Sequence, residues 1–141
     1  MYKKILVALE NGPADRALVP HVTQLARKLE SKLLLVHVAD GWVARNFDAL
    51  ELAESDEMKQ DRAYLEGLAA SMRGEGLQVE TMLGLGEPPI AIVKIAEQEQ
   101  CDLIALAAHG HKALGDLIFG STISKVHHST NIPMLVVHAE R

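Results

Sequence analysis

The chain has 141 residues, of which 48% are hydrophobic and 23% are charged, and its formal net charge is −5. This length suits one domain over residues 1–141, and an acidic balance without a stripe of basic residues argues against nucleic acid as a partner. Cys101 has no second cysteine for a disulfide, and no apolar run approaches the roughly 20 residues that span a membrane, so we expect a cytoplasmic protein without membrane contact.

Short apolar runs alternate with longer amphipathic stretches, which predicts strands that alternate with helices. Residues 5–9, 33–38 and 103–107 are nearly unbroken apolar runs, as in parallel strands that are covered on both faces. In residues 77–83, Leu77, Val79, Thr81 and Leu83 alternate with Gln78, Glu80 and Met82. This pattern suits a strand with one poorly covered face, at an edge of the sheet. Residues 134–137 form a last, uniformly apolar strand.

The spacing of apolar residues predicts helices within residues 17–29 and 58–72, and a third helix after the Pro88-Pro89 pair. Pro20 predicts that the first helix begins late or kinks at this residue. Glycines at residues 74 and 76 end the second helix. Residues 40–55 show no clear period, and we expect a loop or a loosely held helix there.

This order of elements predicts an α/β fold, a doubly wound five-stranded parallel sheet with helices on both faces, which is a Rossmann-like arrangement. With the alternating third strand at an edge, the strand order is 3-2-1-4-5. Ligands of such sheets lie at the carboxyl ends of the strands, where the strand order reverses. The loops at this point are residues 10–13 and the segment that begins at residue 107.

Residues 107–122 contain three glycines and end in Ser121-Thr122. Glycine lets the backbone approach an anion, and a helix N-terminus favours negative charge, so the segment suits phosphate binding with Ser121 or Thr122 at the N-cap. The competing interpretation is that these glycines only allow the chain to turn and bind nothing. The segment is not a Walker A loop, because Asp116 and Leu117 stand where that motif needs Lys and Ser or Thr.

Glu10, the histidines and Cys101 are the other residues considered for a functional role. Glu10 follows the first strand, where its carboxylate suits a ribose hydroxyl or a divalent ion, or caps the first helix. The histidines lack the spacing of a zinc site, so we expect no metal centre. His37 is expected to be a hydrogen-bonded histidine within its strand. Cys101 precedes the fourth strand, at the opposite end of the sheet from the ligand, which argues against a nucleophile. No catalytic residue is assigned.

The last strand is apolar and lies at an edge of the predicted sheet. An exposed apolar edge is a template for aggregation, so we expect it to pair with the same strand of a second copy. The predicted homodimer interface is residues 133–138, bounded by Pro133 and His138. Coverage by the chain's own last three residues is the alternative.

Several segments resemble the universal stress protein family across essentially the whole chain: KKILVAL, LLLVHVAD, GEPPIAIVKIAEQEQCDLIALAAHG, GSTISKV and NIPMLVV. The ATP-binding branch of this family has the signature Gly-x2-Gly, nine residues, then Gly and Ser or Thr. Gly110, Gly120 and Ser121 match this signature, whereas Ala107 stands at its first glycine. Glu10 stands where the family usually has a nucleotide-contacting aspartate.

The resemblance implies a dimeric regulatory protein of the stress response that binds ATP or another adenine nucleotide, with or without Mg²⁺, and acts on an unknown protein partner. A nucleotide-free dimeric adaptor stays open as an alternative, as does a slow ATPase or self-phosphorylating enzyme. The candidate nucleotide-binding residues are Ala8, Leu9, Glu10, Val38, Ala107, His109, Gly110, His111, Gly120, Ser121, Thr122 and Ile123.

Overall fold

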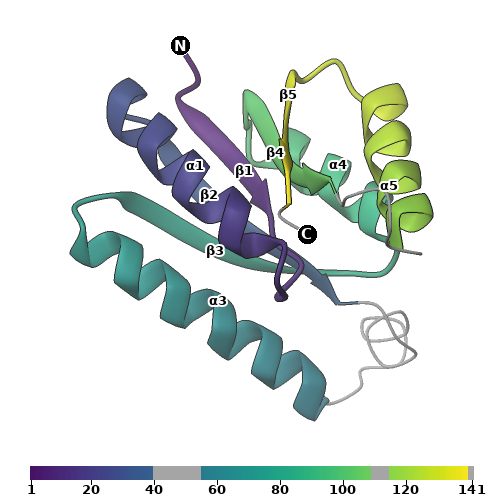
Figure 1. The fold of residues 1–141 in the computed structure, drawn as a ribbon, viewed down its shortest axis with the longest axis horizontal. Helices are drawn as coiled ribbons and strands as arrows, with labels where there is room; N and C mark the ends of the chain where they lie inside the picture. The colour runs from purple at the N-terminus through teal and green to yellow at the C-terminus, as the bar shows by residue number, and fades with distance from the viewer. Residues whose placement is uncertain (40–54, 109–114, 140–141) are drawn as a thin grey trace.

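The computed structural model describes residues 1–39, 55–108 and 115–139, with side chains from residue 122 onward in the last range. Five strands form one parallel sheet in the order β3-β2-β1-β4-β5 (Figure 1). This confirms the α/β class and the strand order expected from the sequence. The strands are β1 (Lys4–Ala8), β2 (Lys32–Ala39), β3 (Gln78–Leu85), β4 (Leu103–Ala108) and β5 (Met134–His138).

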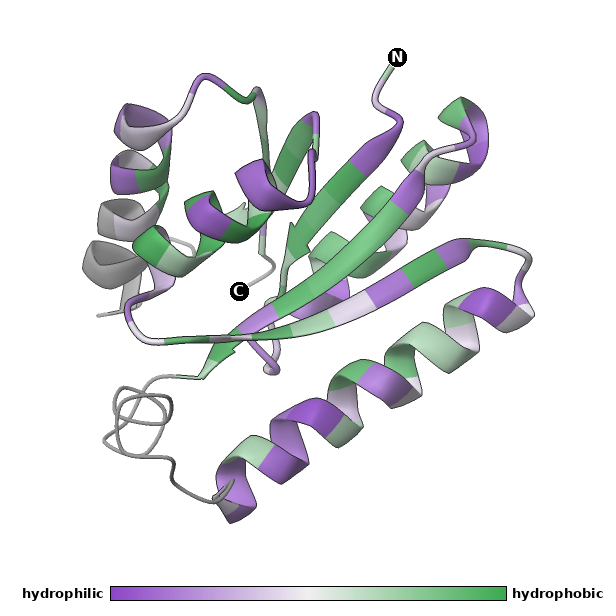
Figure 2. Ribbon diagram, turned by 180° about the vertical axis from the view of Figure 1, so that it is seen from behind, coloured by the Kyte–Doolittle hydropathy of each residue, from purple (hydrophilic) through white to green (hydrophobic). Residues whose placement is uncertain are grey.

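The helices cover both faces of this sheet, as predicted (Figures 1 and 2). Helices α1 (Asp15–Leu29) and α3 (Asp56–Gly74) pack on one face, and α4 (Pro88–Gln98) and α5 (Gly115–Ser129) pack on the other. Helix α4 begins at its proline pair, where the missing N–H groups cost no helical hydrogen bond.

Two expectations about helix starts need correction. Pro20 lies inside α1, which already begins at Asp15, so of the two alternatives for Pro20 the late start is wrong. Helix α5 begins at Gly115, so Ser121 and Thr122 lie beyond its first turn and not at its N-cap. In both cases a residue that is common at the start of a helix lies inside the helix. The loop or loosely held helix expected over residues 40–55 lies outside the described residues, except for Ser55, which is the N-cap of α3.

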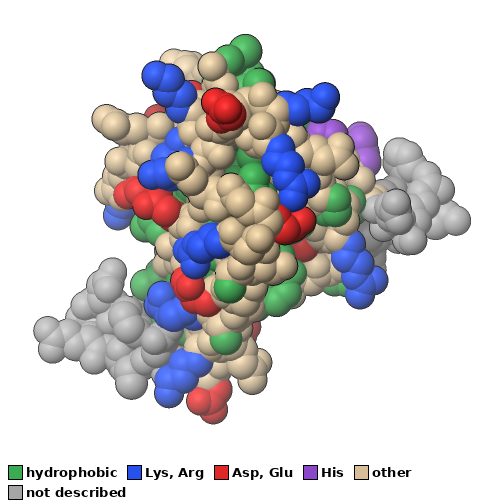
Figure 3. All heavy atoms as spheres, turned by 90° about the vertical axis from the view of Figure 1, so that its left-hand side faces the viewer, with side chains coloured by type: hydrophobic (Ala, Val, Ile, Leu, Met, Phe, Trp, Pro, Cys, Tyr) green, Lys and Arg blue, Asp and Glu red, His purple; other side chains and the backbone are tan. Residues whose placement is uncertain are grey.

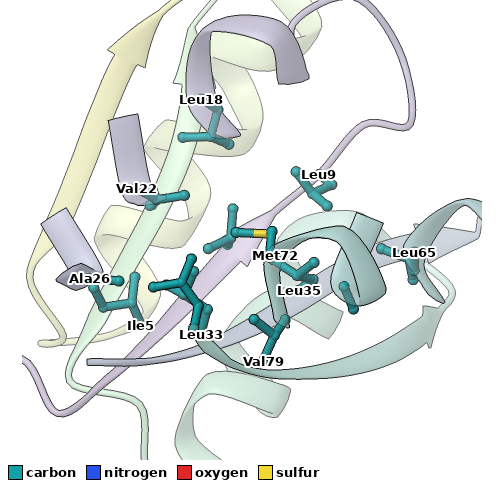
Figure 4. Packing of buried hydrophobic residues seen from close by; sticks show 14 of the residues in the cluster. Ile5, Leu9, Leu18, Val22, Ala26, Leu33, Leu35, Leu65, Met72 and Val79 are labelled. Carbon is teal, nitrogen blue, oxygen red and sulfur yellow. The ribbon is translucent and has the colours of Figure 1, made fainter. Parts of the chain in front are cut away.

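The hydrophobic core forms two layers because successive strand residues point to opposite faces of the sheet. Figure 4 shows the layer between the sheet and the helices α1 and α3, where Leu33 and Leu35 of β2 pack against Met72 of α3. The residues between them in β2, Leu34 and Val36, belong to the layer beneath α4 and α5. This alternation decides which side chains of the strand ends reach the site.

Candidate functional site

A pocket of about 190 Å³ opens at the carboxyl ends of β1, β2 and β4, between the sheet and the helices α4 and α5. The strand order reverses between β1 and β4, so the pocket lies where open α/β sheets bind ligands. Its lining residues are Ala8, Leu9, Glu10, Val36, His37, Val38, Pro88, Ile92, Leu106, Ala107, Thr122 and Ile123.

Seven of the predicted site residues meet in this pocket. They come from the ends of three strands and from α5, and they are Ala8, Leu9, Glu10, Val38, Ala107, Thr122 and Ile123. Gly120 and Ser121 belong to α5 by their backbone, immediately before Thr122. His109, Gly110 and His111 lie outside the described residues.

The pocket walls are mostly apolar, with Val36, Val38, Ile92, Leu106 and Ile123 drawn from the core layer beneath α4 and α5. Glu10 and Thr122 are among the few polar residues that line it. Apolar walls with a few placed polar groups suit a flat organic ring that carries a hydrogen-bonding substituent.

The methyl group of Ala107 does not obstruct this pocket. Ala107 is 3% exposed and belongs to the core layer that faces α1 and α3, together with Ala105. Leu106, between them, belongs to the layer on the pocket side. Ala107 therefore borders the pocket mainly through its backbone, as a glycine would.

Hydrogen bonds fix the backbone that follows β1. The N–H of Leu9 donates to the carbonyl of Val36 over 2.7 Å, and the carbonyl of Leu9 accepts from Nδ1 of His37 over 2.9 Å. The N–H of Glu10 donates to Oδ1 of Asp15 over 3.0 Å. Since the N-cap of α1 is Ala14, Glu10 does not occupy the helix-capping position considered for it.

Asp15 is a site residue that the sequence did not reveal. Its side chain is buried, and its second oxygen accepts from the hydroxyl of Tyr64 over 3.1 Å. Burial raises the pKa of Tyr64 to about 12, with a further contribution from the negative charge of Asp15. An acidic residue in the first turn of a helix is common, so only the contact with a residue 49 positions away distinguishes Asp15.

His37 lies in β2 and is hydrogen-bonded, as expected, although it is only partly buried, and it also borders the pocket on the other face of the strand from its ring. Its Nε2 lies 3.4 Å from Oδ2 of Asp61 in α3. Asp61 also accepts, through Oδ1, a 3.1 Å bond from the side-chain amide of Asn11. Asp61 thus joins α3 both to β2 and to the turn after β1.

The described residues contain no group of His, Cys, Asp and Glu that could hold a metal ion. In the same part of the chain, no helix is long and apolar enough to cross a membrane. Cys101 is buried, and burial raises the pKa of its thiol to about 11. A protonated, inaccessible thiol is a poor nucleophile.

The model of the universal stress protein family matches residues 1–138 of the chain. Universal stress protein MJ0577 of Methanocaldococcus jannaschii is 27% identical over 154 residues, which cover 97% of this chain and 95% of the relative. Its solved structure superimposes with a TM-score of 0.77 and covers 100% of this chain and 99% of that chain.

Two further solved structures share the fold at lower identity. A universal stress protein from Archaeoglobus fulgidus in complex with dAMP has a TM-score of 0.70 and 21% identity, over 96% of this chain and 98% of the other. A universal stress protein in complex with cAMP has a TM-score of 0.71 and 18% identity, over 99% and 98%.

Proposed function

Because this chain belongs to the universal stress protein family, we propose that it is a cytoplasmic, dimeric regulator of the stress response that binds an adenine nucleotide in the pocket at the ends of β1, β2 and β4. The observation that carries this proposal is the position of the pocket, at the reversal of strand order, with mostly apolar walls and Glu10 among its lining residues. Relatives of the same fold are described in complex with dAMP and with cAMP.

The base and the sugar of the nucleotide occupy the described pocket in this proposal. Val38 and Ile92 enclose the base, the backbone near Ala8 and Leu9 provides hydrogen-bonding groups to its edge, and Glu10 accepts from a ribose hydroxyl. A pocket of about 190 Å³ is smaller than the ~300–1,000 Å³ of sites for whole drug-sized ligands. The phosphates therefore extend beyond it.

The phosphates lie along the glycine signature that ends in Gly120 and Ser121. Thr122, the next residue, already lines the pocket, so the end of the signature is adjacent to the proposed sugar. The ligand in this proposal is ATP, with or without Mg²⁺. The backbone N–H groups of α5 that have no helical partner belong to its first turn, which begins at Gly115, and Gly120 lets a phosphate approach because it has no side chain. Binding of this kind needs no Walker A lysine.

The net charge and the distribution of charged side chains argue against nucleic acid as a partner. On the face shown in Figure 3, Lys and Arg side chains lie among Asp and Glu side chains and form no continuous stripe within the described residues of that face. The formal net charge of −5 has the same sign as a phosphodiester backbone.

The dimer of this proposal forms through β5. This strand pairs with β4 on one side only and ends the sheet, and Val136 is 38% exposed at this edge. Pairing of two β5 strands about a two-fold axis gives hydrogen-bond partners to the free backbone N–H and C=O groups of both edges.

The decisive experiment is calorimetric titration of the purified protein with AMP and ATP, each with and without Mg²⁺. Ala8→Leu is the informative variant, because Ala8 lines the pocket and packs with the layer beneath α4 and α5, so a larger side chain occupies the place of the base. Ala70→Leu, the same change at an exposed position of α3, is the control. Gly120→Val tests the phosphate end.

Micromolar binding that Ala8→Leu and Gly120→Val abolish, and that Ala70→Leu preserves, is the expected result. Absence of heat and of a thermal shift at millimolar nucleotide would refute nucleotide binding and favour the adaptor. Phosphate release above background that disappears in Gly120→Val would favour the slow ATPase.

A further inference from the structure

We infer that His37 is a positioning residue of the nucleotide pocket, which fixes Leu9 and through it Glu10; the inference rests on the proposed function. Glu10 enters the pocket from the turn after β1, where the chain leaves the sheet. The direction of its side chain therefore depends on how firmly the peptide groups of Leu9 and Glu10 are held.

Three hydrogen bonds hold this stretch, two of them to β2 and one to α1. The bond from the N–H of Leu9 to Val36 continues the ladder between β1 and β2. The bond from the N–H of Glu10 to Asp15 joins the turn to α1. The bond from Nδ1 of His37 holds the carbonyl of Leu9, which belongs to the peptide group immediately before Glu10. Because a carbonyl oxygen only accepts, Nδ1 is the donor to Leu9, and Nε2 attracts the carboxylate of Asp61 only when it carries a proton as well, as in the imidazolium form.

The ring of His37 is itself held in place from α3. Asp61 Oδ2 lies 3.4 Å from Nε2, and the side chains of His37 and Asp61 are both 16% exposed. Since Asp61 Oδ1 also accepts from Asn11, one carboxylate supports the ring and the turn. Asn11 has a φ of 57°, so the chain reverses direction directly after the residue that His37 positions.

The imidazole ring of His37 lies on the face of the sheet opposite the pocket. Along β2, Leu33 and Leu35 belong to the layer that faces α1 and α3, and His37 continues this alternation toward Asp61 of α3. Val36 and Val38 belong to the layer on the pocket side. His37 is therefore placed to act on the ligand through the backbone of Leu9.

Two substitutions at His37 separate this role from general stability. In His37→Asn, the amide nitrogen occupies the place of Nδ1 and donates to Leu9, but contact with Asp61 is lost. In His37→Gln, the amide reaches toward Asp61, and the carbonyl of Leu9 loses its donor. Since His21 is exposed on α1, His21→Gln is the matched control.

We expect the Kd for AMP to rise about tenfold in His37→Gln, the order that a lost hydrogen bond produces, and to stay within about threefold of wild type in His37→Asn and His21→Gln. Equal weakening in the two His37 variants would overturn the inference, since loss of stability alone predicts no rescue by asparagine. Wild-type affinity in His37→Gln would overturn it as well.

A second measurement does not depend on nucleotide. Amide hydrogen exchange of residues 9–12 in the free protein should be at least about fivefold faster in His37→Gln than in His37→Asn, with distant strand amides unchanged. Unchanged exchange overturns the positioning role even if wild type binds AMP. If exchange is faster in His37→Gln but the wild-type protein binds no nucleotide, the proposed function is refuted. The role of His37 in fixing the turn is then still supported.

Discussion

The hydroxyl of Tyr64 donates a hydrogen bond to Oδ2 of the buried Asp15 over 3.1 Å, and this bond joins the middle of α3 to the first turn of α1. The other oxygen of Asp15 accepts from the N–H of Glu10. A helix on the surface is thus connected, through one buried carboxylate, to the residue at the rim of the pocket. The two helices and the turn after β1 form one hydrogen-bonded unit.

Tyr64→Phe should lower the free energy of unfolding by about 1–2 kcal/mol near neutral pH, because a buried carboxylate oxygen loses a donor. The value belongs at the lower end, since Tyr64 is 41% exposed. Urea denaturation of wild type and variant measures it. Tyr2→Phe removes the other tyrosine hydroxyl and serves as the control.

The same pair predicts a pH dependence. The pKa of Tyr64 is raised from 10.0 to about 12, so its contribution to stability is present below pH 10 and is lost as the pH rises toward 12. The difference in urea midpoint between wild type and Tyr64→Phe should be constant below pH 10 and vanish by about pH 12. A difference that persists above pH 12 would contradict the bond to Asp15.

Ala107→Gly introduces the glycine that the nucleotide-binding signature has at this position. The methyl group packs in the layer facing α1 and α3, so its removal costs packing and adds backbone entropy to the unfolded state, about 1 kcal/mol or more. Because the methyl faces away from the pocket, the Kd for AMP should change less than about threefold. A much tighter Kd would show that the methyl obstructs the ligand.

Val136→Pro should dissociate the proposed dimer without unfolding the chain. Ile104 donates to the carbonyl of Pro133, and Ala139 donates to Ala108, so the odd-numbered residues of β5 turn their backbone groups toward β4. The backbone of Val136 therefore faces the free edge, where proline removes a donor that a second β5 needs. Sedimentation analysis should give a monomer.

The control for this change is Val136→Thr, which keeps the N–H and the β-branched shape. It should sediment like wild type. A dimer that persists in Val136→Pro would place the interface elsewhere on the molecule.

Cys101 is the one cysteine of the chain and reports on opening of the structure. With a pKa of about 11, on the order of one thiol in a thousand is ionised at pH 8, and burial also keeps reagent away. A disulfide reagent that releases a chromophore should label the native protein far more slowly than protein in concentrated guanidinium chloride. Rapid labelling of the native state would contradict the buried position.

The sequence predicted the parts of the site that depend on order along the chain. Runs of apolar residues identify the strands, and the alternating pattern of residues 77–83 identifies the edge, from which the strand order and the position of the pocket follow. A late start of the first helix at Pro20 and an N-cap at Ser121 or Thr122 are both wrong, because local preferences at a helix end are only weak predictors of where a helix begins.

Amino-acid order alone thus determined the fold class, the strand order and the family, since hydrophobic periodicity and glycine spacing are local properties that a chain carries into any environment. Only the tertiary structure decided that Asp15 contacts Glu10, that His37 joins Leu9 to Asp61, and that the methyl of Ala107 turns away from the pocket. The physical reason is that hydrogen bonds between distant residues depend on the packing of α3 against the sheet, which no local pattern specifies.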